Sequence, residues 1–450
     1  MNSISLESLS WIHRAEILLV LPVLALLVLA PRLEKSPLAT SSIGLVGAFA
    51  TVACGIMDVG ASRFALVLGG GVIVVALLLL RTAELFDPRQ RPEGAALILV
   101  GGIGAIVLAA STTLLELAIG VELISLAGAT LVALGRGRRP LEAGFKYFLL
   151  TAVTFATLLF GMSLIFLGTG SLALPTSGSA VAGLSLLVAA GVGLMVIGLA
   201  FKLAIVPVHF GALDAYTAGP ASFVGFVMVA SKLGAAVALA KLAAGMGAGI
   251  SSLLLGAGLV TIGFGVLASF AQSDLRRLLA YSAVAHAGFL AVAAGSPQGG
   301  TEAVRFYLVC YAATAGLAFA AIAGTGTEGF PLARLGPNAP NGLGRVRSFA
   351  LLIALLSLAG VPPLPGFWAK LAVLGAAWDS WGMLATALTA LGGVVGIIYY
   401  LRPMPDLLAS TLGASPEAGE SKGATPVAVA LLLVVAALGL VPGLAWWLAR

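Results

Sequence analysis

The sequence predicts an all-α polytopic membrane protein, and three observations support this class. Hydrophobic residues make up 60% of the 450 residues, whereas charged residues make up only 9%. A soluble domain carries about 25% charged residues, so this chain lacks the side chains that cover a water-facing globule. Apolar runs of about 17–25 residues, long enough to cross a bilayer, recur along its whole length. The runs are continuous rather than alternating, which favours helices over barrel strands.

About 14 candidate transmembrane helices follow one another along the chain. Their expected ranges are 13–30, 38–56, 64–81, 95–111, 113–134, 143–168, 183–206, 221–244, 250–270, 277–295, 302–323, 349–377, 382–401 and 425–447. The first run lacks a small-residue cleavage site and leads into a basic loop, so we interpret it as a span rather than a signal peptide. The polar stretch 402–424 is typical of a flexible connector.

Basic residues are distributed unequally between the loops. Loops after even-numbered spans contain only Arg63, Lys241 and Arg305. Loops after odd-numbered spans contain Arg32, Lys35, Arg81, Arg89, Arg91, Arg136, Arg138, Arg139, Arg276, Arg277, Arg334, Arg345, Arg347, Arg402 and Lys422. The positive-inside rule therefore places the arginine-rich loops in the cytoplasm and both termini on the outer face.

Spans seven and twelve contain sequences that break helices. Residues 201–209 include Pro207, and residues 359–370 include three prolines within four residues. Proline removes a backbone donor and clashes with the preceding turn. Inside a bilayer, such a break is tolerated only where it is buried in protein or lines a wet cavity. Because the breaks lie five spans apart, we expect two five-helix repeats, spans 4–8 and 9–13.

This organisation divides the chain into four segments. They are an N-terminal three-helix region (1–94), a first five-helix repeat (95–245), a second five-helix repeat (246–402), and a cytoplasmic connector with the C-terminal helix (403–450).

Four charged side chains lie inside the expected spans: Glu122, Lys202, Lys232 and Lys370. A charge at the bilayer centre costs about 2.5–3.5 kcal/mol on insertion scales. Desolvation favours the neutral form of a lysine, and a nearby carboxylate favours the charged form. Changing the distance between them therefore switches the lysine between holding and releasing a proton. We expect Glu122 and Lys202 to form such a pair, with Lys232 and Lys370 as successive stations that titrate as a coupled set.

Structural explanations stay open for these charges. A lysine near the end of a span can extend to the interface without any function, and this applies best to Lys202 and Lys370, whose depth depends on the breaks. A Glu–Lys pair can also neutralise itself inside a protein.

Three further residues are candidates for proton transfer. His286 lies well inside span ten and titrates near neutral pH, although a histidine bonded to a neighbouring carbonyl would fit the same position. His209 follows the break in span seven and either lines a half-channel or shapes a loop. Lys146, four residues after Glu142, either takes part in charge transfer or forms an exposed helical pair.

No cofactor motif is present in the sequence. Cys54 and Cys310 are isolated, without CxxC or cluster-ligand spacing. Residues 324–329 match GxGxxG by letter, but they follow a membrane helix rather than a strand. Topology and anionic lipid explain the basic loops, so nucleic acid is not needed as a partner. We expect any redox chemistry to belong to partner chains.

Several phrases of the sequence carry a family resemblance in their order and spacing. They are Glu122–Leu126, Glu142–Phe148, Gly198–Lys202, Pro207–His209, Ala230–Lys232, Leu275–Ser282, Leu356–Pro362, Gly366–Lys370 and Tyr399–Arg402. From about Leu115 to Leu401, the chain resembles the antiporter-like, proton-translocating membrane subunits of NADH-quinone oxidoreductase (complex I), most of all subunit N.

The resemblance implies a fourteen-helix fold with inverted repeats in the inner (cytoplasmic) membrane. It implies proton translocation coupled to quinone reduction elsewhere in the complex, with Glu122, Lys202, Lys232 and Lys370 as proton carriers. NADH, FMN, iron–sulfur clusters and quinone would belong to partner subunits, which would include further antiporter-like subunits. The run 210–216 departs from the family's usual pattern and keeps only its acid and its tyrosine.

Two other classes of function stay open. One is a subunit of a cation/proton antiporter or of a membrane-bound hydrogenase, which use homologous folds. The other is a silent membrane scaffold. Neighbouring genes would distinguish an antiporter or hydrogenase subunit from a complex I subunit. Proton pumping by a Lys232→Ala variant would distinguish a silent scaffold from a proton carrier.

Overall fold

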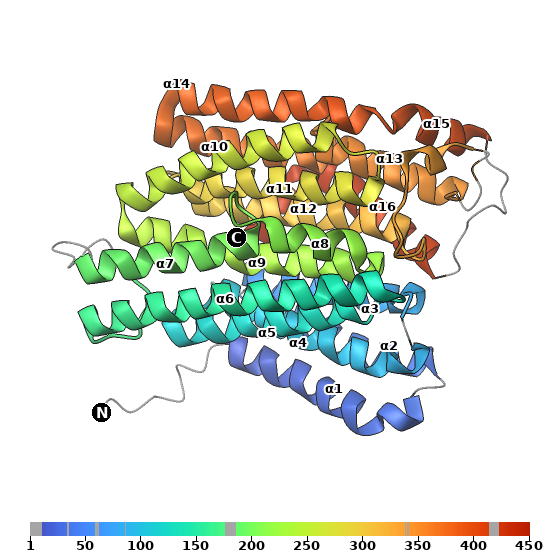
Figure 1. Cartoon of the computed structure of the whole chain (residues 1–450), viewed down its shortest axis with the longest axis horizontal. Helices are drawn as coiled ribbons and strands as arrows, with labels where there is room; N and C mark the ends of the chain where they lie inside the picture. The colour runs from blue at the N-terminus through green and yellow to red at the C-terminus, as the bar shows by residue number, and fades with distance from the viewer. Residues whose placement is uncertain are drawn as a thin grey trace.

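The computed structural model describes residues 11–33, 36–58, 63–85, 87–175, 186–337, 339, 342–413 and 423–450. The regular secondary structure of these residues is helical, and only isolated β-bridges accompany it. Long helices lie side by side and run lengthwise across Figure 1. The all-α class that the sequence predicts is confirmed.

Seventeen α-helices are described. They are α1 (Trp11–Leu33), α2 (Pro37–Met57), α3 (Arg63–Leu79), α4 (Arg91–Ala110), α5 (Leu114–Ala133), α6 (Arg138–Thr169), α7 (Leu186–Leu203), α8 (Phe210–Ala218), α9 (Ala221–Met246), α10 (Ala248–Phe270), α11 (Leu275–Ala294), α12 (Gly300–Ile322), α13 (Arg345–Ala359), α14 (Pro365–Leu401), α15 (Met404–Gly413), α16 (Ala424–Leu440) and α17 (Pro442–Ala449). Lys35, residues 183–185 of the seventh expected span, and connector residues 414–422 with Lys422 lie outside the described residues.

Eleven of the described helices are long and apolar enough to cross a membrane, or twelve if the bent pair α16–α17 forms one span. The chain is therefore a multi-pass membrane protein. Helix length explains why this number is below the fourteen that the sequence predicts. α13 has only 15 residues, and the apolar part of α1 is the short stretch Leu18–Leu33. α14 includes residues of two expected ranges, and it consists of two helices joined at Gly382, whose φ of 74° and ψ of −165° are not helical.

α9 forms the centre of the bundle. It contacts α3, α4 and α5 on one side and α11 and α12 on the other, and in Figure 1 it lies between the blue helices and the yellow to red ones. The apolar stretch of α9 that is long enough to span a membrane is completely buried. A helix that is apolar all round belongs in the interior of a large bundle. This position places Lys232, in the middle of α9, in the core of the protein.

Glycines let neighbouring helices approach closely. A Cβ added at Gly161 of α6 would lie 2.5 Å from the carbonyl oxygen of Gly191 in α7, and one added at Gly258 of α10 would lie 2.9 Å from that of Gly288 in α11. Small residues at such contacts are typical of membrane helix pairs. They hold the broken helix α7 firmly against α6 and explain much of the glycine content.

Cationic side chains cover the carboxyl ends of several helices. Lys241 donates hydrogen bonds to the carbonyls of Ala109 and Ser111 at the end of α4, at 2.8 and 2.9 Å. Arg347 donates to the carbonyl of Ala321 at the end of α12, at 2.8 Å. The last carbonyls of a helix lack partners within it and carry partial negative charge. Lys241 and Arg347 therefore stabilise intact helix ends.

Candidate functional site

Helix α7 ends inside the bundle in a Schellman motif. Ala204 follows the last helical residue with a left-handed φ of 67°, and the amide of Ile205 donates to the carbonyl of Ala200 at 2.9 Å. The carbonyl of Leu203 is left for another partner, and the Nζ of Lys232 donates to it at 2.9 Å. Lys232 is completely buried. A lysine of the central helix thus caps the broken end of α7.

Helix α13 ends in the same motif. Gly360 has a left-handed φ of 88°, and the amide of Val361 donates to the carbonyl of Leu356 at 3.1 Å. Lys370 lies in α14, across the break from α13, and its Nζ donates to the carbonyl of Ala359 at 2.7 Å. The carboxyl end of the second broken helix is therefore also capped by a lysine.

The two breaks share a capping geometry that depends on lysine charge. In each break, the partner of the ammonium group is the final carbonyl of a helix and not a carboxylate side chain. The carboxyl end of a helix attracts cations, and transporters use such half-helix ends to bind them. A neutral amine loses most of this attraction, so gain or loss of a proton changes the strength of the contact. Each break also contains a cis bond before a proline, Val206–Pro207 and Pro362–Pro363.

Lys202 lies at the same end of α7 but has a different environment. Its side chain is 2% exposed, and its Nζ makes no hydrogen bond to the described residues. The Nζ lies 5.3 Å from the centre of the Tyr147 ring, within the range of a cation–π contact. Glu122 of α5 is half-buried and interacts electrostatically with Lys202, without a direct ion pair. The expected pair is thus present at longer range, and the Lys202 ammonium remains unbonded.

His286 forms a network of side-chain hydrogen bonds in the second half of the chain. Its Nδ1 is 2.5 Å from the hydroxyl of Tyr307, and its Nε2 is 3.1 Å from the hydroxyl of Tyr400. Tyr400 also bonds to Ser282. Hydroxyls both donate and accept, so the ring can take a proton on one nitrogen and release one from the other. The bond to a neighbouring carbonyl, considered as the structural alternative, is not what holds this ring.

The tyrosines of this network are not predicted as site residues. Four of the seven tyrosines in the chain, Tyr307, Tyr311, Tyr399 and Tyr400, lie in this one cluster and contact one another's rings. Two features of the sequence could have indicated the cluster: tyrosine is rare in the chain, and these four occur as two close pairs. Distance along the chain hid the cluster, because α12 and α14 bring its two halves together only in three dimensions.

Two small, separate cavities lie near the His286 network and the central helix α9. One is lined by His286, Tyr311 and Leu358, and the other by Tyr311, Leu358 and Met228 of α9. Each has a volume of about 10 Å³, enough for about one water molecule. Met228 precedes Lys232 by one helical turn. Tyr311 lines both cavities, and its ring also lies 5.1 Å from that of His286.

His209 and Lys146 have environments that differ from each other. His209 is 2% exposed, its Nδ1 makes no hydrogen bond to the described residues, and its ring packs 4.6 Å from that of Phe264. The Lys146 side chain is 52% exposed and forms ion pairs with Glu142 at 2.6 Å and with Asp214 at 3.9 Å. The structure thus places an aromatic contact at His209 and a surface charge cluster at Lys146.

Taken together, the buried groups of the site can hold and move protons. Within the described ranges, no cluster of three or more His, Cys, Asp or Glu side chains could bind a metal ion. Cys54 and Cys310 are free. Among the described lysines and histidines, Lys202, Lys232, His209 and His286 are buried in an apolar bundle, and Lys370 is half-buried. These groups exchange protons by switching between charged and neutral forms.

Comparisons with known proteins give consistent results. The family model described as the transmembrane region of NADH:quinone oxidoreductase and Mrp antiporter subunits matches residues 111–396. NADH-quinone oxidoreductase subunit 14 of Thermus thermophilus is 38% identical over 357 residues, which is 77% of this chain and 78% of that protein. NADH-quinone oxidoreductase subunit N of Ectopseudomonas mendocina is 38% identical over 335 residues, 71% of this chain and 67% of that protein.

A solved structure is similar over nearly the whole chain. A chain of respiratory complex I from Thermus thermophilus, with bound aureothin, superimposes with a TM-score of 0.81 and 30% sequence identity. The match covers 96% of this chain and 98% of that one.

Proposed function

The chain belongs to the NADH:quinone oxidoreductase/Mrp antiporter family of membrane subunits, and we propose that it works as the proton-translocating subunit N of a NADH-quinone oxidoreductase. In this role it is part of a translocase whose redox steps take place in partner subunits. NADH, FMN, iron–sulfur clusters and quinone would be bound by those partners, which include other antiporter-like membrane subunits.

The observation that carries the proposal is the pair of lysine-capped helix breaks. Lys232 and Lys370 each place an ammonium group on the last carbonyl of a broken helix inside the membrane. Loss of the proton weakens this contact, and return of the proton restores it. A movement at the break is thereby linked to the protonation state of the lysine, as a proton pump requires.

The proposed path has three stages. Glu122 and Lys202 form the entry switch, because the carboxylate acts on a buried ammonium group that has no hydrogen bond of its own. A proton released by Lys202 passes to a neutral Lys232 amine, which then caps α7 as an ammonium group. The next transfer runs past Tyr311 to His286 and on to Lys370, one proton for each step. We place Lys146 and His209 outside the main path, at its periphery.

Topology and repeats follow from the same assignment. We propose fourteen spans, with α7–α8 and α13 plus the first part of α14 as the two broken ones, and Gly382 as the boundary between spans twelve and thirteen. Spans 4–8 and 9–13 form the inverted repeats, within the four segments bounded at residues 94, 245 and 402. The arginine-rich loops face the cytoplasm, and both termini face the outside of the inner membrane.

The test uses two lysines of the same helix. Lys232→Ala and Lys241→Ala both remove a lysine of α9 that caps a helix end, but only Lys232 caps a broken helix. Each variant of the assembled complex is reconstituted in vesicles, and proton uptake is measured per NADH oxidised. We expect proton uptake to fall strongly in Lys232→Ala and to persist in Lys241→Ala.

Two results would overturn the proposal. Normal proton uptake by an assembled Lys232→Ala complex would remove the carrier role and leave a structural one. Purification of the native complex, followed by identification of its subunits, tests the parent assembly separately. Antiporter subunits without any quinone-reductase subunit would place the chain in a different complex.

A further inference from the structure

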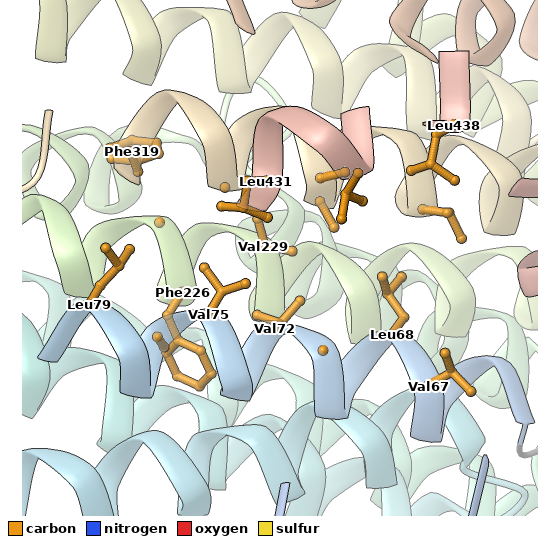
Figure 2. A pocket seen from close by; sticks show the side chains of 18 of the residues that line it. Val67, Leu68, Val72, Val75, Leu79, Phe226, Val229, Phe319, Leu431 and Leu438 are labelled. Carbon is orange, nitrogen blue, oxygen red and sulfur yellow. The ribbon is translucent and has the colours of Figure 1, made fainter. Parts of the chain in front are cut away.

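A large apolar cavity lies between α3, α9, α12 and α16, and Figure 2 shows side chains from all four helices around it. Its volume is about 260 Å³, whereas one water molecule needs about 10–15 Å³. Val72 and Val75 of α3, Phe226 of α9 and Leu431 of α16 form part of its wall. Protein interiors contain few voids larger than a water molecule. The size and lining of this one fit a hydrocarbon chain.

The basic residues that depart from the positive-inside pattern gather at one end of this cavity. Arg63 begins α3 one helical turn before Val67, which lines the cavity. The guanidinium group of Arg305 lies 5.8 Å from the ring of Phe64, and Arg305 interacts electrostatically with Lys241. Arg63, Lys241 and Arg305 were spread over three loops of the sequence. The structure brings them to one place on the arginine-poor side of the membrane.

Arg63 has an incomplete set of partners. Its Nε and Nη2 atoms are buried and make no hydrogen bond to the described residues, and its guanidinium group lies 3.8 Å from the ring of Trp447. Lys241 is already bound to the carbonyls of α4, and Arg305 interacts with Glu302. Arginine binds phosphate oxygens with two parallel hydrogen bonds. Arg63 therefore offers its free N–H groups to an anion at the mouth of the cavity.

We propose that this cavity binds an acyl chain of an anionic phospholipid, whose phosphate group is held by Arg63 with help from Arg305. The cavity runs along α3 from Val67 to Leu79, about 18 Å at 1.5 Å per residue. One leaflet of a bilayer core is about 15 Å thick, so the length suits a lipid chain. Trp447 lies where interfacial tryptophans usually lie, at the level of the headgroups.

The experiment measures lipid binding to the full-length purified protein. Delipidated protein is titrated with palmitoyl-oleoyl phosphatidylglycerol or phosphatidylcholine, and bound lipid is counted by native mass spectrometry. Gly71→Phe places a ring in the cavity, at a glycine where a Cβ meets nothing within 4 Å. Gly263→Phe is the matched control, because Gly263 is equally open but lies on the exposed face of α10.

We expect phosphatidylglycerol to bind about tenfold (about 1.4 kcal/mol) more tightly than phosphatidylcholine, because the choline cation of phosphatidylcholine compensates the charge of its phosphate. Gly71→Phe should lose this site and Gly263→Phe should keep it. Arg63→Gln should lower the affinity for phosphatidylglycerol to that for phosphatidylcholine, whereas Arg89→Gln on the opposite side should not. If Gly71→Phe fails to fold, Gly316→Leu fills the same cavity from α12.

Three results would overturn the proposal. Unchanged lipid binding by the cavity-filling variants would place the lipid elsewhere. Equal binding of the two lipids by the wild-type protein would show that the site does not select an anionic lipid. A subunit helix cross-linked into the cavity of the assembled complex would show that a protein segment, rather than a lipid, occupies it.

Discussion

The break after α7 and the break after α13 share a capping motif but differ in what surrounds them. After α7, a second lysine, Lys202, lies beside the capped end, and the carboxylate of Glu122 acts on it. After α13, no carboxylate of the described residues contacts Lys370, and His286 with its tyrosines lies nearby. The same lysine-capped helix end thus lies beside a charge pair in the first half of the chain and beside a hydrogen-bonded histidine network in the second half.

This difference suggests a division of labour. A lysine and a glutamate in an apolar environment respond strongly to small changes in their separation, because the interior screens charge weakly. A histidine bonded on both nitrogens conducts protons with little movement. We infer that the first half controls when a proton enters and the second half passes it on.

The largest expected effect comes from removing either capping lysine. Lys232→Met and Lys370→Met should each abolish nearly all proton uptake, because the two stations act in series. The double variant should then be no worse than either single one. Proton uptake per NADH, measured in vesicles at equal complex content, tests this. Two partial losses that add up in the double variant would indicate parallel paths.

A second prediction separates stability from function at Lys202. Lys202→Met removes a buried, unbonded amine and should raise the free energy of unfolding by about 1–3 kcal/mol, while proton uptake falls. Lys232→Met provides the contrast, because it leaves the carbonyl of Leu203 without a partner and should lower stability by about 1–3 kcal/mol. Denaturant titration in detergent measures both. A loss of stability in Lys202→Met would show that its ammonium group is well paired.

A third prediction compares the backbone at the two caps. Gly360→Ala should cost about 1–3 kcal/mol, because φ is 88° and the new Cβ would lie 3.2 Å from the Nζ of Lys370. Ala204→Gly should instead stabilise the protein by about 1 kcal/mol by relieving the left-handed alanine. Thermal unfolding of the two variants provides the measurement. Changes of the same sign would mean that the two caps are not equivalent.

The smallest effect is expected at the surface. Lys146→Gln removes an exposed lysine whose partners, Glu142 and Asp214, are themselves exposed. Exposed ion pairs contribute little to stability, and this one lies off the proposed path. Unfolding and proton uptake should both stay close to wild type. A clear loss of proton uptake would bring Lys146 into the path.

The sequence predicts the helical fold and the positions of both breaks, because continuous apolar runs and clustered prolines act locally. It also predicts that lysines lie beside the breaks. It cannot predict that Lys232 and Lys370 bond to carbonyls, since this depends on where Leu203 and Ala359 end their helices. Alanine at position 204 gives no sign of a left-handed residue, whereas glycine at 360 does.

Contacts across the bundle account for what the sequence does not predict. The tyrosines around His286 come from α12 and α14, and nothing in either helix alone points to the other. The break at Gly382, by contrast, follows from the sequence, because Asp379 and Ser380 interrupt the apolar run between the expected ranges 349–377 and 382–401.

The direction of the lysine contacts along the chain has a consequence for biosynthesis. The acceptor carbonyl of Lys232 lies 29 residues before it, and that of Lys370 lies 11 residues before it. When the ribosome delivers each of these lysines to the membrane, its acceptor has already been made. The ammonium groups therefore do not depend on a later segment of the chain for their hydrogen-bond acceptor. His286, whose partners Tyr307 and Tyr400 come later, can wait because an imidazole enters the membrane uncharged.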